Sequence, residues 1–361
     1  MQYELFAVLS IIICLLILLA EYIWLAVLAK RQEDSANKYR VAHQQTQSIV
    51  EGILYSPTAS ARERETEVLK KIMGNDTRIF EMISAQLCFW EEYGDDETLG
   101  NKSEVIDGVY EALNPIKLFS DILKSGNKYK IGYACRRLAD YDAYDCLEDI
   151  YGFSKSKNRN LSYNAAMALS RLGFADGVAE YILRIQDDKR YSSRIVNELF
   201  ANFSSDRARL ASIVFEKCND YIKTTVINAI APYNLECFRQ LYIDGSRNRN
   251  ADMRVACVRA LGNFADEKNE HALLIAARDK DWVVRSAAVK GLQKLATPAA
   301  IERVKEATRD KEWWVRQAAA YSLIDMNVNI SEIEEVLGGY DKYASDAVKY
   351  ALYRNIDLKE D

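Results

Sequence analysis

Apolar residues recur at helical spacing from about residue 128 to the end of the chain. Around Leu292 they stand at positions i, i+3, i+4, i+7, i+8 and i+11, which places them on one face of an α-helix. These residues are Val284, Ala287, Ala288, Gly291, Leu292 and Leu295. The pattern predicts an amphipathic helix that buries this face.

The same face returns every 29 to 31 residues, and each copy is centred on an apolar anchor residue. The anchors are Leu138, Leu169, Phe200, Ile230, Leu261, Leu292, Leu323 and Leu352. Two copies are nearly identical, DKDWVVRSAA at 279–288 and DKEWWVRQAA at 310–319, and second helical stretches such as 298–310 lie between copies. One helix pair has too small an apolar face to be stable alone, whereas stacked pairs bury a continuous core. We therefore expect an all-α fold, an α-solenoid of helical hairpins.

One motif in these copies is similar to that of a known family. The pattern D-x-x-V-R-x-A-A-x-x-x-L, present from Asp281 to Leu292, resembles the short HEAT repeat of about 30 residues. The resemblance is strong over 250–325, fair back to about residue 128 and absent before about residue 110. HEAT arrays are mostly protein-binding scaffolds, so the resemblance implies a protein-binding scaffold, here of a membrane-anchored bacterial type.

The N-terminal segment Leu5–Ala29 is apolar except for Ser10 and Glu21. It is long enough to cross a membrane, because about 20 residues span the hydrocarbon core. Lysines and arginines follow it at 30–40 and none precedes it, which puts the N-terminus outside and the remainder in the cytoplasm. We therefore expect one transmembrane helix before the solenoid, in the inner cell membrane. Cleavage as a signal peptide near 27–29 is the alternative.

Glu21 is the charged residue of this segment, and two interpretations of it are open. In the first, it lies at the membrane interface and reaches the headgroups. In the second, Ser10, Cys14 and Glu21 share one helical face and form a contact with a transmembrane helix of a partner.

These elements divide the chain into four parts. They are an anchor at 1–30, a juxtamembrane connection at 31–57, a helical capping region at 58–114 and a solenoid of about eight repeats at 115–361. The third part reads as helical but does not follow the repeat, which suits a region that covers the first apolar face of a solenoid.

Arginine and tryptophan occupy equivalent positions in the strongest copies. The arginines stand seven residues before their anchors and are Arg254, Arg285 and Arg316. They predict a structural ladder in which each arginine pairs with an acidic neighbour across repeats. The tryptophans at the helix starts are Trp282, Trp313 and Trp314. They are candidate protein-binding residues, because Trp and Arg are enriched in binding hot spots. A tryptophan that covers a repeat junction is the alternative.

Composition and the absence of known motifs argue against several classes of function. The net charge of -5 argues against a protein devoted to nucleic acid. Phosphate-binding loops, nucleophile elbows and HExxH motifs are absent, and the two histidines, His43 and His271, are expected on the surface. The His-Glu pairs that bind iron in deoxyhypusine hydroxylase, a HEAT-like enzyme family, are also absent. The sequence therefore predicts no catalytic residue, no cofactor and no metal.

The functional hypothesis is a non-enzymatic, membrane-tethered HEAT-repeat adaptor that binds a protein partner at the cytoplasmic face. A more specific version is an accessory subunit of a membrane complex for polysaccharide synthesis or secretion. The alternatives are a nucleic-acid-binding HEAT-like protein and a lyase-like or chaperone-like helper in enzyme maturation.

Overall fold

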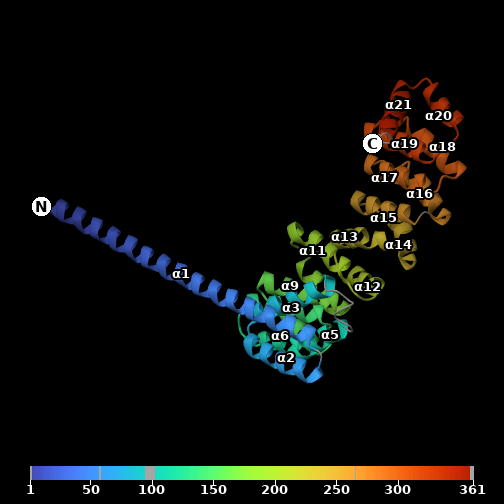
Figure 1. Ribbon diagram of the computed structural model, residues 1–361. Coiled ribbons are helices and arrows are strands. Elements are labelled where there is room, and N and C mark those ends of the chain that lie inside the picture. Colours follow the sequence, from blue (N-terminus) through green and yellow to red (C-terminus); the bar gives the residue numbers. More distant parts are fainter. Residues whose placement is uncertain (1, 57, 94–101, 265, 358–361) are drawn as a thin grey trace. The chain divides into compact units, whose positions relative to one another are not determined.

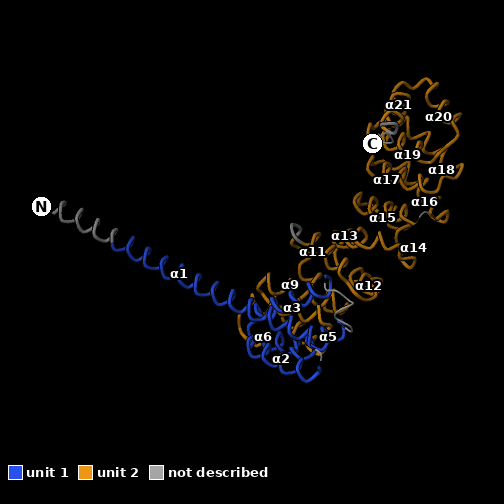
Figure 2. Tube along the Cα trace, in the orientation of Figure 1, with its two compact units in different colours: residues 1–122 blue, residues 123–361 orange. Residues whose placement is uncertain are grey.

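The computed structural model describes most of the chain, and the described residues are 2–56, 58–93, 102–264 and 266–357, without the side chains of 2–15, 189–191 and 355–357. All regular elements in these ranges are helices, so the predicted all-α fold is confirmed. The chain divides into two compact units, residues 1–122 and residues 123–361 (Figures 1 and 2).

The first unit has its own apolar core. Its helices are α1 (Gln2–Tyr55), α2 (Ala59–Met73), α3 (Thr77–Tyr93), α5 (Lys102–Leu113) and α6 (Pro115–Leu123). The C-terminal part of α1 buries Ile53, α2 buries Leu69 and α3 buries Phe80. The Phe80 ring meets Phe119 of α6 edge to face, with 5.6 Å between centroids. The predicted capping role of 58–114 concerns the contact between the two units and stays a prediction.

The predicted single-pass membrane anchor is contradicted by the structure. Within the described part of the chain, no helix is both long enough and apolar enough to cross a membrane. Helix α1 continues without a break into the charged sequence from Lys30 onward. The membrane localisation, the outside N-terminus and the cytoplasmic placement rested on this span and fall with it.

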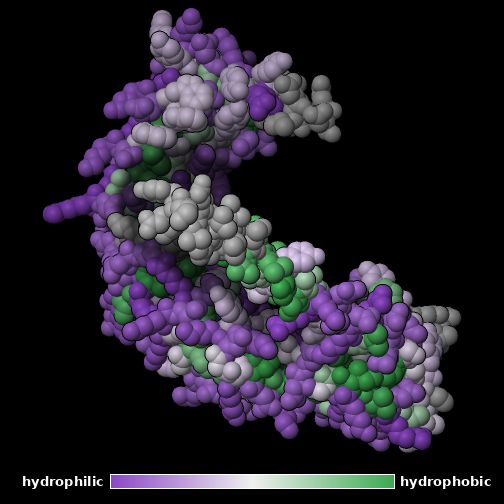
Figure 3. Space-filling model, turned by 90° about the vertical axis from the view of Figure 1, so that its left-hand side faces the viewer, coloured by the Kyte–Doolittle hydropathy of each residue, from purple (hydrophilic) through white to green (hydrophobic). Residues whose placement is uncertain are grey.

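Helix α1 nevertheless carries exposed apolar side chains, and Figure 3 shows apolar residues in several places on an otherwise mostly hydrophilic surface. Those on α1 include Leu16, Leu18, Tyr22 and Trp24, each more than half exposed. Glu21 is exposed as well. The side chains of Ser10 and Cys14 lie outside the described part, so their predicted shared contact with Glu21 is untested, and its membrane setting is lost.

The second unit is a stack of helix pairs (Figure 1). We term the helices that carry the repeated motif the motif helices: α7 (Lys128–Asp140), α9 (Arg159–Arg171), α11 (Lys189–Ala201), α13 (Asp220–Ile230), α15 (Ala251–Asn263), α17 (Trp282–Gln293), α19 (Trp313–Asp325) and α21 (Lys342–Asp357). Between them lie the back helices: α8 (Leu147–Ser154), α10 (Ala175–Ile185), α12 (Arg207–Lys217), α14 (Arg239–Gly245), α16 (Glu270–Ala276), α18 (Pro298–Ala307) and α20 (Ile330–Leu337). Each motif helix packs against the next along the chain. This is the arrangement of an α-solenoid.

The anchor residues form the core of this stack. The seven anchors from Leu138 to Leu323 are buried, because each motif helix is covered by its neighbours and by a back helix. Leu352 of α21 is only half-buried, since no later described helix covers it. Side-chain caps start several motif helices, as where Asn250 accepts from the Asp252 N–H and Asp281 from the Val283 N–H.

Glycines bring α15 and α17 into close contact. A Cβ atom placed on Gly262 would lie 2.8 Å from the Cα of Gly291, and one on Gly291 would lie 3.1 Å from the Cα of Gly262. Because backbone cannot move aside as a flexible side chain can, a side chain at Gly262 would push the two helices apart, and one at Gly291 would be crowded. The backbones of these two helices therefore approach closely at this point.

A lysine joins the last two back helices. Lys305 of α18 is buried, and its ammonium group lies 2.6 Å from a Glu332 carboxylate oxygen and also contacts Glu335, both of α20. Glu335 is 59% exposed. The contact between α18 and α20 is thus an ion pair of a buried lysine with partly solvated glutamates.

We expect Gly262→Ala to lower the free energy of unfolding by about 1–3 kcal/mol, the usual cost of overpacking. Gly152→Ala in α8 is the matched control, because open space surrounds that position. There the change should raise stability by about 0.5–1 kcal/mol through helix propensity alone. Urea denaturation of both variants measures the difference, and equal effects would contradict the close approach.

Candidate functional site

Arginines of the motif helices bind the loops that precede them and the loops that follow. Arg285 donates through Nε and one Nη to the two carboxylate oxygens of Asp310, at 2.6 and 2.7 Å. Its other Nη donates to the carbonyl oxygens of Asp279 and Lys280, at 2.9 and 3.2 Å. Both Arg285 and Asp310 are largely shielded from solvent. The side chain thus joins the loop before α17 to the loop before α19.

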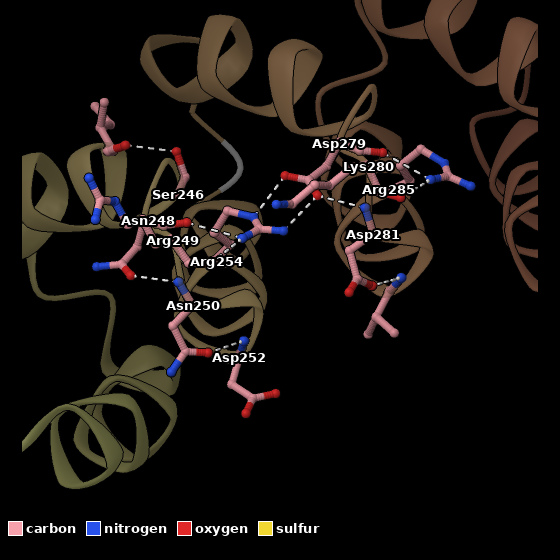
Figure 4. Close-up of polar contacts among 12 residues, drawn as sticks. Ser246, Asn248, Arg249, Asn250, Asp252, Arg254, Asp279, Lys280, Asp281 and Arg285 are labelled. Atoms are coloured by element: carbon pink, nitrogen blue, oxygen red, sulfur yellow. Dashed lines mark hydrogen bonds and ion pairs between the residues drawn. The ribbon is translucent and has the colours of Figure 1, made fainter.

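Arg254 repeats this geometry one repeat earlier (Figure 4). It donates to both carboxylate oxygens of Asp279, at 2.8 and 2.9 Å, and to the carbonyl oxygens of Asn248 and Arg249. Asp279 also accepts from the Asp281 N–H at 2.8 Å, and Asp281 caps α17. The loop at 279–281 is therefore held from both sides, which fixes the start of α17.

Arg316 differs from the other two arginines. It donates to the carbonyl oxygens of Asp310 and Lys311, at 2.8 and 3.0 Å. Its guanidinium lies 5.3 Å from the centre of the Tyr343 ring. Among the described residues, no carboxylate pairs with it. The bidentate contact across repeats is therefore present at Arg254 and Arg285 and missing at Arg316.

The three tryptophans form one continuous cluster at the starts of α17 and α19. The rings of Trp282 and Trp314 stack at 6.4 Å between centroids with 22° between their planes. Trp313 lies edge-on to Trp314 at 4.6 Å. The three remain 39%, 50% and 59% exposed, respectively. The cluster therefore leaves much of its apolar surface in water.

This cluster lines part of a groove of about 1040 Å³ that runs across α13, α15, α17, α19 and α21. We term it the aromatic groove. Its other aromatic residues are Tyr321 and Tyr350, both exposed. Its floor is made of small residues, among them Gly262, Ala287, Gly291, Ala318 and Ser322. Small buried residues of α15, α17 and α19 thus form the floor, and the exposed aromatic residues of α17, α19 and α21 form the walls.

The groove carries more positive than negative charge. Arg259, Lys290 and Lys294 line it and are exposed. The acid in its lining is Asp325, which accepts a hydrogen bond from Gln293 at 2.9 Å. Lys294 donates to the side-chain oxygen of Asn263 at 3.2 Å. Arg259 and Lys290 form no ion pair with any carboxylate of the described residues, so two cations face solvent beside the aromatic walls.

Sequence reasoning identified the tryptophans but missed the tyrosines and the cations. Arg259, Lys290, Tyr321 and Tyr350 each stand two residues before an anchor. The repeat register could therefore have aligned them, as it aligned the arginines. The described residues include no group of three His, Cys, Asp or Glu side chains that could hold a metal ion.

Comparison with known proteins identifies the repeat type. The family model of HEAT repeats matches residues 242–324. The HEAT resemblance noted in the sequence is thereby confirmed for this part of the solenoid, which contains the aromatic walls of α17 and α19. No curated protein matches the sequence.

Several solved structures are similar to this chain at low sequence identity. The structure of Kap121p bound to Nup53p is 12% identical with a TM-score of 0.45, covering 86% of this chain and 41% of that one. Human deoxyhypusine hydroxylase is 15% identical with a TM-score of 0.27, covering 80% and 98%. The complex of CpcE and CpcF of phycocyanin lyase from Nostoc sp. PCC7120 is 14% identical with a TM-score of 0.29, covering 65% and 94%. These values support no conclusion about function.

We expect Arg285→Ala to lower the free energy of unfolding by about 1–3 kcal/mol, because Asp310 would stay shielded after losing both guanidinium hydrogen bonds. Arg316→Ala is the matched control. It removes the same side chain from an equivalent position where the acceptors are carbonyl oxygens, and it should cost less. Chemical denaturation measures both, and equal losses would show that the carboxylate contact contributes little.

The Arg285–Asp310 ion pair should also make the stability of the fold depend on pH. Burial opposes ionisation of Asp310, but the hydrogen bonds and charge of Arg285, together with the hydrogen bond from the Glu312 N–H, outweigh it and hold the pKa of the carboxyl below its ordinary value of 3.8. A carboxyl whose pKa is lower in the folded state contributes stability at neutral pH and loses it as pH falls through the folded pKa. The stability difference between the unaltered protein and Asp310→Asn should therefore be constant from about pH 7 to 5 and shrink below about pH 4. A difference that stays constant into acid would contradict the lowered pKa.

Proposed function

We propose that this chain is a protein-binding scaffold whose HEAT-repeat solenoid presents the aromatic groove to a partner. The observation that carries the proposal is the continuous cluster of Trp282, Trp313 and Trp314 in the lining of that groove. Between 39% and 59% of each tryptophan is exposed. Single exposed apolar residues are ordinary, whereas a contiguous patch on a hollowed surface is typical of a binding site.

The energetic argument rests on the size and rigidity of these rings. A tryptophan buries about 150–250 Å² when fully covered, and it loses little side-chain entropy because few of its bonds rotate. Here the rings already restrict one another by stacking, so a partner would order them at small further cost. Interface residues of this kind contribute the largest share of binding energy.

The arginine contacts support this role indirectly. Arg285 and Asp310 fix the loop before α19, from whose first turn Trp313 and Trp314 project. Arg254 and Asp279 do the same for the loop before Trp282. Because both loops that lead into the tryptophan cluster are fixed, the cluster is better suited to a preformed binding surface than to one that becomes ordered on binding. We also propose that the chain has no catalytic role.

Single alanine substitutions at Trp282, Trp313, Trp314 and Arg285 test the proposal. Replacement of a tryptophan should weaken partner capture by about 2 kcal/mol or more, with a small change in melting temperature. Arg285→Ala should instead lower the melting temperature. Affinity capture from cells that produce the protein, followed by mass spectrometry, and thermal melting measure the two effects. If every tryptophan variant melts as early as Arg285→Ala and captures the same proteins as the unaltered chain, the cluster is core packing.

A further inference from the structure

We infer that the aromatic groove takes an extended peptide with acidic residues at one end and aromatic or large aliphatic residues at the other. The inference rests on the proposed function and adds the chemical class of the ligand and its spacing. It derives from a row of five exposed residues that line the groove, each two residues before an anchor. In chain order the row is Asn228, Arg259, Lys290, Tyr321 and Tyr350.

The row changes character along the solenoid. Arg259 of α15 and Lys290 of α17 supply two neighbouring cations, and Tyr321 of α19 and Tyr350 of α21 supply two neighbouring aromatic rings. Because the motif helices pack side by side, equivalent positions on successive helices lie about 8–10 Å apart. A ligand that crosses the helices therefore meets two positive positions and then two aromatic positions at this interval.

This interval fits an extended peptide of one particular pitch. A polyproline II segment rises about 3.1 Å per residue with three residues per turn, so residues three apart face the same side about 9 Å apart. Every third side chain would then meet the next member of the row. The matching ligand has two acidic residues three positions apart, followed at the same spacing by two aromatic or large aliphatic residues, in either chain direction.

The charges of the groove favour carboxylates as the negative groups. Arg259 and Lys290 are exposed and form no ion pair with a carboxylate of any described residue. The acid of the lining, Asp325, is engaged by Gln293. A peptide carboxylate would therefore meet a free cation without first displacing an internal acid.

A single-stranded nucleic acid is the rival occupant, and the same residues disfavour it. Such ligands stack their bases on open aromatic faces along a basic track. Trp282 and Trp314 already turn faces toward each other at 6.4 Å, and Trp313 stands edge-on to Trp314. The positive stretch of the row spans only α15 and α17, in a chain of net charge -5. A peptide with two acids fits this short stretch better than a phosphate backbone does.

Selection of random dodecapeptides displayed on phage against the full chain tests the inference. We expect enrichment of peptides in which two acidic residues stand three positions apart. Two aromatic or large aliphatic residues should lie next to them in the sequence, again at intervals of three. Binding of a selected synthetic peptide, followed by fluorescence anisotropy, should weaken about tenfold or more in Lys290→Glu. Lys128→Glu is the matched control, since it makes the same charge change at an exposed site in the first turn of α7, where a negative charge is favourable. That variant should bind as the unaltered protein does.

The outcomes separate the inference from the proposed function. Selected peptides that require Trp314 but lack acidic residues, or bind Lys290→Glu equally well, overturn the inference and leave the scaffold proposal standing. A selection that yields no peptide dependent on Trp314 overturns both. Tight binding of single-stranded oligouridylate that weakens steeply with salt and is lost in Lys290→Glu, without enriched acidic peptides, replaces the peptide with a nucleic acid.

Discussion

The packing of one motif helix against the next is the contact on which the rest of the second unit depends. No helix pair here has enough apolar surface to fold alone, so each anchor residue is buried only because a neighbour covers it. Gly262 and Gly291 set the closest point of that packing between α15 and α17. Because the register is fixed, any residue type that recurs with the repeat becomes a straight row on the surface. The arginine contacts and the mixed row of cations and tyrosines are both products of that register.

The sequence was sufficient to predict those parts of the molecule whose residues recur at a regular interval. The anchors and the helix pairs could be read from apolar spacing, since burial of one face imposes that spacing. The motif that resembles the HEAT repeat was strongest over 250–325, and the family model matches 242–324. The alignment of Arg254, Arg285 and Arg316 also followed from period alone. The period did not reveal that Arg316 would lack the carboxylate contact that the other two arginines make, because that contact depends on side-chain geometry at the start of α21.

The remaining errors have physical causes as well. Tyr321 and Tyr350 were overlooked because exposure on a motif helix depends on which neighbours lie beside it, and no single copy of the motif records that. The predicted membrane anchor rested on composition, whereas the structure describes one unbroken helix from Gln2 to Tyr55 in which polar sequence follows directly on the apolar stretch.

Two kinds of ionic contact between successive repeats differ in how strongly dissolved salt weakens them. The Arg254 and Arg285 contacts are shielded, so dissolved ions screen them little. The acids that hold Lys305 between α18 and α20 are partly solvated, and their attraction weakens as counterions accumulate. Rising ionic strength should therefore weaken the contact of α18 with α20 more than the arginine contacts that hold the loops before α17 and α19, so the coupling between neighbouring repeats becomes uneven along the solenoid.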